Sequence, residues 1–311
     1  MQKRGKTAAG TQRWYCTFCE ESSTKRRPDH QERSKEKLFK QWLTGNATLG
    51  EIARSQGVSV RTLQDWFRSC WQRPCAAILK QPADILVLDA TGMSRECVLL
   101  VVLNTETNAP VAWYSAVRET YLTWKPLLGA IPYTPMHLVC DGHQGLAKAA
   151  KERWPDILIQ RCHAHVLREM RGFLTLNPKL PAGIALRILV EEMKLIQTRR
   201  QKRRWVRKVF AWDRKYKHFL KEKTKTLEGH WRYTHRRLRR ARSHLFNALP
   251  DLFRYIKNSR VPKTSNQLEG GINSPIKDLA RKHRGLVTYK KLVLASLYLK
   301  KRGEKPPRRF L

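Results

Sequence analysis

The segment between residues 82 and 161 constrains the fold more than any other part of the chain, because short apolar runs alternate there with helix-like stretches. Residues 85–88 form a continuous apolar run, which is typical of a strand covered on both faces. By the same reasoning, strands are expected at 97–103, 111–115, 137–140 and 157–159, and helices at 122–130 and 147–153. The order β-β-β-α-β-α-β predicts a domain of the α+β or α/β class.

Two aspartates stand at the ends of expected strands, Asp89 after the first and Asp141 after the fourth. If these strands are neighbours in the sheet, the two carboxylates converge at one edge. Magnesium prefers oxygen ligands, and two ions roughly 4 Å apart can activate an attacking hydroxyl and stabilise a leaving oxygen at phosphorus. Such a cluster needs a third carboxylate, and the candidate is Glu269. The alternative for either aspartate alone is a turn former or helix cap.

The charge of the chain points to a polyanionic partner. Lys and Arg number 63 against 25 Asp and Glu, a formal net charge of +38. A surface this positive repels itself unless a polyanion neutralises it, so nucleic acid is the predicted partner. A membrane surface is the alternative, but the basic residues are interleaved with aromatic residues instead of forming one amphipathic anchor.

The chain is expected to stay inside the cell. Its first residues lack the apolar core of a signal peptide, and the longest strongly apolar run, residues 98–103, is too short to span a bilayer. The seven cysteines are odd in number and mostly scattered, which fits a reducing compartment and predicts no structural disulfides.

Residues 1–33 are predicted to form a polar, basic arm. Cys16 and Cys19 form a C-x-x-C pair, which is half of a structural zinc site, and His30 is the nearest candidate for a third ligand. The zinc hypothesis needs four ligands, and no second pair lies nearby. The alternative is two unligated thiols in a flexible arm.

Residues 34–75 show the pattern of a helix-turn-helix. Helices are expected at 35–44 and 49–56, with a third beginning after Ser59, a good N-cap residue, and Gly57 in the tight turn. Arg61 and Gln64 of the third helix would face a major groove, while the apolar residues between them hold the helix to its domain. The alternative is a three-helix packing module that reads no DNA.

The stretch from about 162 to 262 is predicted to be helical without strands, and it carries the densest positive charge. Trp205 and Trp212 are seven residues apart and share a helix face, which favours a place in the core. Trp231 lies among basic residues and is the better candidate for stacking an unpaired base. The arginines expected to bind phosphates beside it are Arg236, Arg237, Arg239 and Arg240.

The order of Asp89, Asp141 and Glu269 resembles the triad of the DDE transposases with an RNase H-like fold. Within that class the chain looks like the mutator-type transposases of insertion sequences, and the likeness spans roughly residues 85–297. Three matches carry it: Asp141-Gly142 followed by a helix and Trp154-Pro155, the C-x-x-H pair of Cys162 and His165, and the phrase T-x-N-x-L-E-G-x-x-N from Thr264 to Asn273.

The resemblance implies an RNase H-like mixed sheet with helices on both faces. This catalytic domain would occupy residues 82–165 and 263–311, interrupted by an all-α insertion at 166–262 and preceded by the helix-turn-helix. It also implies that Cys162, His165, Asn266 and Asn273 support the active site. Cys162 and His165 alone would make a poor zinc site. The N-terminal C-x-x-C resembles the second knuckle of a transposase zinc ribbon.

The predicted function is therefore that of a bacterial, cytoplasmic transposase, which binds transposon ends, cleaves the strand and joins it to target DNA. Two Mg²⁺ ions, replaceable by Mn²⁺, would be the cofactors. Double-stranded DNA would be the partner, both as terminal inverted repeats and as target, bound by a homodimer or larger assembly. The alternatives are a non-catalytic DNA-binding regulator and a plain RNase H-like nuclease.

Overall fold

The computed structural model describes residues 1–8, 10–24, 28–72, 77–78 and 82–304, and it divides the chain into two units, Met1–Pro74 and Cys75–Leu311. The first unit begins with a three-stranded antiparallel sheet where the sequence suggested an arm. Its strands are β1 (Gln2–Lys6), β2 (Gln12–Tyr15) and β3 (Ser22–Thr24). The pairing satisfies backbone groups in a stretch whose side chains are mostly exposed.

Three helices complete the first unit: α1 (Pro28–Thr44), α2 (Leu49–Ser55) and α3 (Val60–Phe67), followed by the 3-10 turn η1 (Ser69–Gln72). Helix α1 begins at Pro28, earlier than predicted, because the first turn of a helix tolerates proline. The predicted N-cap is confirmed, since the Ser59 side chain accepts a hydrogen bond from Thr62 N. Phe39, Leu43 and Leu63 are fully buried where the helices pack.

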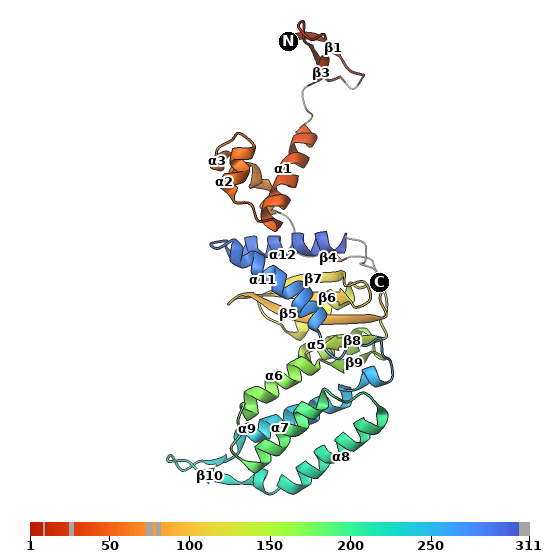
Figure 1. Cartoon of the computed structure of the whole chain (residues 1–311), viewed down its shortest axis with the longest axis vertical. Helices are drawn as coiled ribbons and strands as arrows, with labels where there is room; N and C mark the ends of the chain where they lie inside the picture. Colours follow the sequence, from red (N-terminus) through yellow and green to blue (C-terminus); the bar gives the residue numbers. More distant parts are fainter. Residues whose placement is uncertain (9, 25–27, 73–76, 79–81, 305–311) are drawn as a thin grey trace. The chain divides into compact units, whose positions relative to one another are not determined.

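The second unit is built on a six-stranded mixed sheet in the order β4-β7-β6-β5-β8-β9 (Figure 1). Neighbouring strands from β4 to β5 pair antiparallel, whereas β5, β8 and β9 pair parallel. The elements are β4 (Ala77–Ile78), β5 (Ile85–Ser94), β6 (Cys97–Asn104), β7 (Pro110–Ala116), α4 (Tyr121–Gly129), β8 (His137–Cys140), α5 (Gln144–Arg153) and β9 (Leu158–Arg161). The predicted order from β5 to β9 is confirmed.

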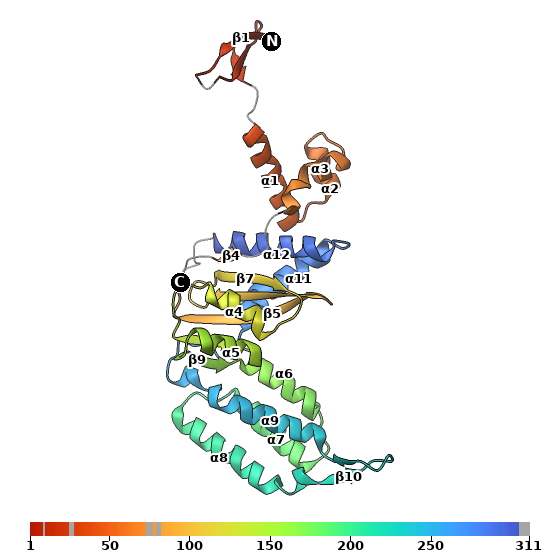
Figure 2. The same cartoon turned by 180° about the vertical axis from the view of Figure 1, so that it is seen from behind.

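Both faces of this sheet are covered, because alternate residues of a strand point to opposite sides. On β5, Leu86 and Leu88 face a core shared with α4 and α5, while Ile85 and Val87 face a second core. That second core includes residues of α11 (Ser274–Lys282) and α12 (Thr288–Gly303). Figures 1 and 2 show these two helix pairs on opposite sides of the sheet. An α+β fold of this kind is compatible with the RNase H-like prediction.

One predicted strand end is wrong. Strand β5 does not stop at Asp89 but runs on to Ser94 and turns back into β6 through Arg95 and Glu96. The cause is the pairing partner, since β6 forms a ladder with β5 from Asn104 to Cys97. Asp89 therefore lies within a strand, at the point where its parallel neighbour β8 ends.

The chain between β9 and the last two helices is mostly helical, with α6 (His163–Leu174), α7 (Pro181–Met193), α8 (Arg199–Tyr216) and α9 (Arg236–Ala248), and with the 3-10 turns η2 (Phe219–Lys221), η3 (Leu249–Asp251) and η4 (Arg254–Ile256). Trp205 and Trp212 are buried and donate to the backbone carbonyls of Leu189 and Ala182, so the prediction that they belong to the core is confirmed.

The prediction that this segment lacks strands is wrong. A two-stranded hairpin, β10 (Lys223–Lys225) and β11 (Trp231–Tyr233), protrudes from the far end of the helices (Figures 1 and 2). All six of its strand residues are exposed, so they carry no alternation of apolar and polar residues that sequence analysis could detect. Among the described residues, no helix is long and apolar enough to cross a membrane.

Candidate active site

Asp89 and Asp141 are brought together by the parallel pairing of β5 with β8. The register aligns Val87 with Val139, so two residues further along each strand Asp89 is level with Asp141. Both carboxylates therefore lie where β8 ends, as the sequence predicted. Asp89 is buried, at 7% exposure, whereas Asp141 is half-buried in the turn between β8 and α5.

Glu269 comes from the far end of the chain. It follows the short helix α10 (Asn266–Leu268) and opens a π-helical turn, η5 (Glu269–Asn273), in which Ser274 N donates to Glu269 O. Such turns are rare and often occur at functional sites. The same turn carries Asn273, whose Nδ2 donates to Asp89 Oδ2 at 2.9 Å. The π turn thus links the Glu269 segment directly to the first aspartate.

The three carboxylates interact electrostatically. Burial raises the pKa of Asp89 to about 7; the positive charge of His165 opposes this shift, and the carboxylates of Asp141 and Glu269 add to it. A buried carboxylate beside two others is costly to ionise unless a cation neutralises it. This donor set therefore fits a hard divalent cation such as Mg²⁺.

Cys162 and His165 lie against Glu269. Cys162 is fully buried, and its Sγ accepts hydrogen bonds from Ser265 N at 3.3 Å and Ser265 Oγ at 3.2 Å. A hydrogen bond with Cys162 raises the pKa of His165 to about 9. Burial raises the pKa of the Cys162 thiol, but hydrogen bonds with His165 and Ser265 outweigh it and hold the pKa below its ordinary value.

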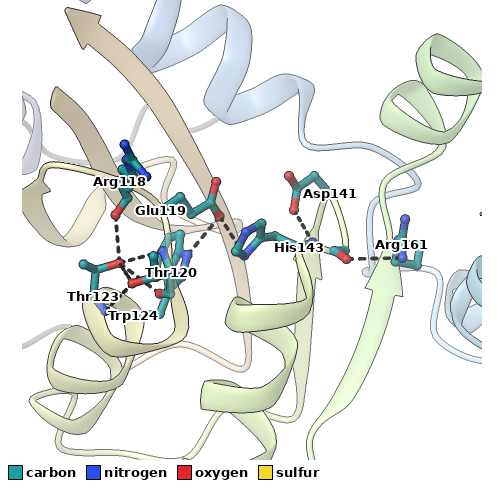
Figure 3. A network of polar contacts seen from close by, with 9 residues as sticks. Arg118, Glu119, Thr120, Thr123, Trp124, Asp141, His143 and Arg161 are labelled. Atoms are coloured by element: carbon teal, nitrogen blue, oxygen red, sulfur yellow. Dashed lines mark hydrogen bonds and ion pairs between the residues drawn. The ribbon is translucent and has the colours of Figure 1, made fainter. Parts of the chain in front are cut away.

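The sequence analysis missed a second set of contacts, which begins at the backbone of Asp141. His143 N donates to Asp141 Oδ1 at 2.8 Å, and His143 Nδ1 lies 3.7 Å from Glu119 Oε1 (Figure 3). Glu119 is fixed in turn by Trp124 Nε1, which donates to Glu119 Oε1 at 2.9 Å. Glu119 follows β7 and is far from Asp141 in the sequence, so no local motif marks it.

Arg161 lies on the other side of the same turn. Its Nη1 is 3.4 Å from Gly142 O, and its guanidinium occupies the space that a side chain at position 142 would fill (Figure 3). A Cβ on Gly142 would lie 1.8 Å from Arg161 Cζ, and the φ of Gly142 is +87°. Only glycine adopts this conformation without strain. A cavity of about 660 Å³ opens here, lined by Asp141, His143, Arg161, Glu169 and His244 among others.

The other predicted site residues lie apart from the carboxylates. Asn266 is exposed and makes no described side-chain contact with the triad, in contrast to Asn273. Cys19 is exposed and Cys16 half-buried. The described residues place no third zinc ligand beside this pair, and the side chain of His30 falls outside the described part of the chain.

Two predicted DNA-binding regions expose their polar residues. On α3, Arg61 and Gln64 are exposed while Leu63 is buried. Trp231, on the hairpin, is 65% exposed. A cavity of about 680 Å³ lies near it and is lined by Phe173, Asp213, Lys217, Leu220, Lys221, Tyr233, Arg236, Arg239, Arg240, Arg242 and Ser243. Its one acid, Asp213, is already paired with Arg242, so the cavity remains strongly cationic.

The mixed sheet, with three carboxylates gathered at its centre, places the protein with the RNase H-like class. Residues 52–287 match the family model described as Transposase IS66 family. This match covers more than half of the chain, which therefore belongs to the IS66 family of transposases, the transposases of insertion sequences. The prediction of a mutator-type transposase is wrong, because the matching family is IS66. A comparison with curated proteins gave no match.

Proposed function

We propose that this chain is a DDE transposase that binds the ends of its element, cleaves the DNA strand and joins the 3′ end to target DNA. The observation that carries the proposal is the pairing of β5 with β8, which sets Asp89 level with Asp141, together with the effect of Glu269 on the pKa of Asp89. Family membership supports an enzyme of DNA transposition that uses divalent metal ions.

In this proposal Asp89, Asp141 and Glu269 hold Mg²⁺, which supplies Lewis-acid stabilisation of the attacking and leaving oxygens. The protein's part is to hold the carboxylates in place. Asn273 Nδ2 orients Asp89, and His143 N orients Asp141. Arg168 Nη2 donates to Glu269 Oε2 at 3.1 Å and lies on the exposed side of the site, where a DNA phosphate would compete for it.

Glu119 and His143 act in this proposal as positioning residues. The buried contact with Trp124 fixes Glu119, which fixes the ring of His143, and the backbone of His143 holds Asp141. Positioning matters because a displacement of about 1 Å at a reacting group costs on the order of a hundredfold in rate.

DNA binding is assigned to two further regions. The exposed face of α3 would read the element end through Arg61 and Gln64, as the second helix of a helix-turn-helix does. The helical insertion would hold phosphates through the arginines of α9, with Trp231 stacking on an unpaired base. The metal in both reactions would be Mg²⁺, with Mn²⁺ as a substitute, and the protein would act as a dimer or larger assembly on the two ends.

The experiment that tests this function uses the full-length chain and linear duplex DNA carrying both ends of the element that encodes it. With Mg²⁺, the proposal predicts nicks at the element ends and covalent products in which those 3′ ends are joined to a plasmid target. Nicking without joined products would favour the plain nuclease. Binding without nicking in either Mg²⁺ or Mn²⁺ would favour the non-catalytic regulator.

A further inference from the structure

Three side chains of different chemical types converge beside the carboxylate triad. Cys162 stands immediately before α6, His165 lies in the first turn of that helix, and Glu269 opens the π turn. One ligand atom from each lies within 4.8 Å of the other two, the only such group of three among the residues that the structure describes. The sequence supplied Cys162 and His165 as a pair, but only the fold adds Glu269 as a third ligand.

The spacing of these atoms suits a tetrahedral ion. With bonds of about 2.0–2.3 Å from zinc to nitrogen, oxygen and sulfur, neighbouring ligand atoms lie roughly 3.3–3.7 Å apart. His165 Nδ1 and Glu269 Oε1 are 3.5 Å apart. His165 Nδ1 is also buried without a hydrogen-bond partner, so a polar atom of the ring is left for a ligand at this place. A small positive adjustment of Glu269, which is half-buried, is all that closure would require.

The ligand types select a different metal from the triad's. Sulfur and imidazole favour Zn²⁺ over Mg²⁺, whereas an all-carboxylate set favours Mg²⁺. The sulfur is also oriented, because Ser265 N and Ser265 Oγ both donate to Cys162 Sγ. Hydrogen bonds of this kind hold the ligands of established metal sites in place. Three protein ligands leave a fourth position for water.

We propose that Cys162, His165 and Glu269 form a site for a thiophilic divalent cation such as Zn²⁺, and that its occupation inhibits the transposase. Glu269 is shared by the two sites, so an ion held by Cys162 and His165 draws this carboxylate away from Asp89 and Asp141. The binding half stands on the geometry of the cluster alone. The inhibition half rests on the proposed function.

Cobalt is the probe for the binding half, because Co²⁺ takes zinc sites and a cobalt–thiolate bond absorbs in the near ultraviolet. The full chain is titrated with Co²⁺ in a background in which Cys16→Ser and Cys19→Ser remove the N-terminal pair. The band should persist in that background and be lost when Cys162→Ser is added. Cys97→Ser, at another buried cysteine, is the matched control and should keep the band. A band that disappears with Cys16 and Cys19, or survives Cys162→Ser, overturns the site.

Because a variant at buried Cys162 can disturb folding, Glu269→Gln provides a second test at a half-buried position. It should weaken Co²⁺ binding at least about tenfold, the scale on which even outer contacts of metal sites act. Unchanged affinity would remove Glu269 from the site and end the proposal of a shared ligand.

The inhibition half is tested by titrating Zn²⁺ into Mg²⁺-supported cleavage by the wild-type chain and by His165→Asn. Zn²⁺ should inhibit the wild type, and the variant should need at least about tenfold more Zn²⁺ for the same fractional inhibition. Equal sensitivity would overturn the inhibitory role. Cleavage by Glu269→Gln at the wild-type rate would instead refute the proposed function, and the cobalt result would still stand.

Discussion

The carboxylate triad and the arginines of α9 hold charge in opposite ways. Asp89 is buried and anchored by Asn273, and its pKa is raised to about 7. Arg236 and Arg240 are exposed, and the described residues offer them no hydrogen bond or ion pair. Charge that does chemistry has to be fixed in position, whereas charge that attracts a polyanion has only to be present. Substitutions in the two regions should therefore fail differently.

The largest effect is expected at the triad. Asp89→Asn, Asp141→Asn and Glu269→Gln each remove a charged ligand while keeping the shape, so each should slow strand cleavage at least about a thousandfold, a barrier increase of several kcal/mol. Binding to element-end DNA should change little. Rates come from gel analysis of cleaved duplex, with exposed Asp156→Asn as the matched control. A wild-type rate from any of the three would remove that residue from the cluster.

The positioning of the triad is tested at Gly142. An alanine there meets the guanidinium of Arg161 and a positive φ, so Gly142→Ala should lower the free energy of unfolding by about 1–3 kcal/mol and slow cleavage about a hundredfold. Gly172→Ala is the control, because its Cβ meets nothing within 4 Å and α6 favours alanine. If both variants cleave equally well, the turn after Asp141 is not held as tightly as the account requires.

The α9 arginines can be divided into two matched pairs. Arg237 Nη2 donates to Gly172 O, and Arg239 Nη1 donates to Leu220 O and stacks on Tyr233 at 3.6 Å. Arg236 and Arg240 lack such described contacts, so Arg236→Ala with Arg240→Ala should flatten log affinity against log salt by up to about 1.8, roughly 0.9 per contact. Thermal stability should be retained.

The anchored pair provides the contrast. Arg237→Ala with Arg239→Ala should lower the thermal midpoint, since both side chains hold backbone carbonyls of other elements. DNA binding measured over a range of salt concentrations separates the two outcomes. Equal salt slopes for wild type and the Arg236/Arg240 variant would make these residues a solvated surface.

The smallest effect is expected on α3. Arg61→Ala with Gln64→Ala should reduce the preference for element-end over random DNA by about tenfold, the scale of one lost base contact. Competition binding at fixed salt measures this ratio. An equal loss of affinity for both DNAs would make α3 a phosphate-binding helix and not a reader of sequence.

The sequence predicted the features that local pattern encodes. The strands before Asp141 and around Asp89 are short buried runs, and the Ser59 N-cap is a local hydrogen bond, so both could be found. The continuation of β5 to Ser94 could not, because it depends on pairing with β6. The β10–β11 hairpin was missed because its strands are three residues long and fully exposed.

The site divides along the same line. Asp89, Asp141 and Glu269 were found through strand ends and a motif, and Asn273 through the same motif. Glu119 and Ser265 were missed, because each acts through a partner that is distant in sequence: Glu119 through His143, and Ser265 through Cys162. Neither carries a local signal that distinguishes it from an ordinary surface or loop residue.

The measurement that tests the central claim most directly is the Mg²⁺-induced rise in thermal midpoint as a function of pH. The pKa of Asp89 is raised to about 7 in the folded protein from its ordinary 3.8, so the folded state favours the protonated form. Without metal, the stability from this residue is full below pH 4 and is lost as the pH rises through about 7. Mg²⁺ needs the ionised carboxylate and offsets that loss.

The rise in midpoint caused by Mg²⁺ should therefore be small at pH 5.5 and grow as the pH passes through about 7, and it should be absent at every pH in Asp89→Asn. Asp141→Asn and Glu269→Gln should reduce it, and Asp156→Asn should leave it unchanged. A Mg²⁺ effect of wild-type size in Asp89→Asn would contradict the account, because the ion would then be bound somewhere other than at the triad.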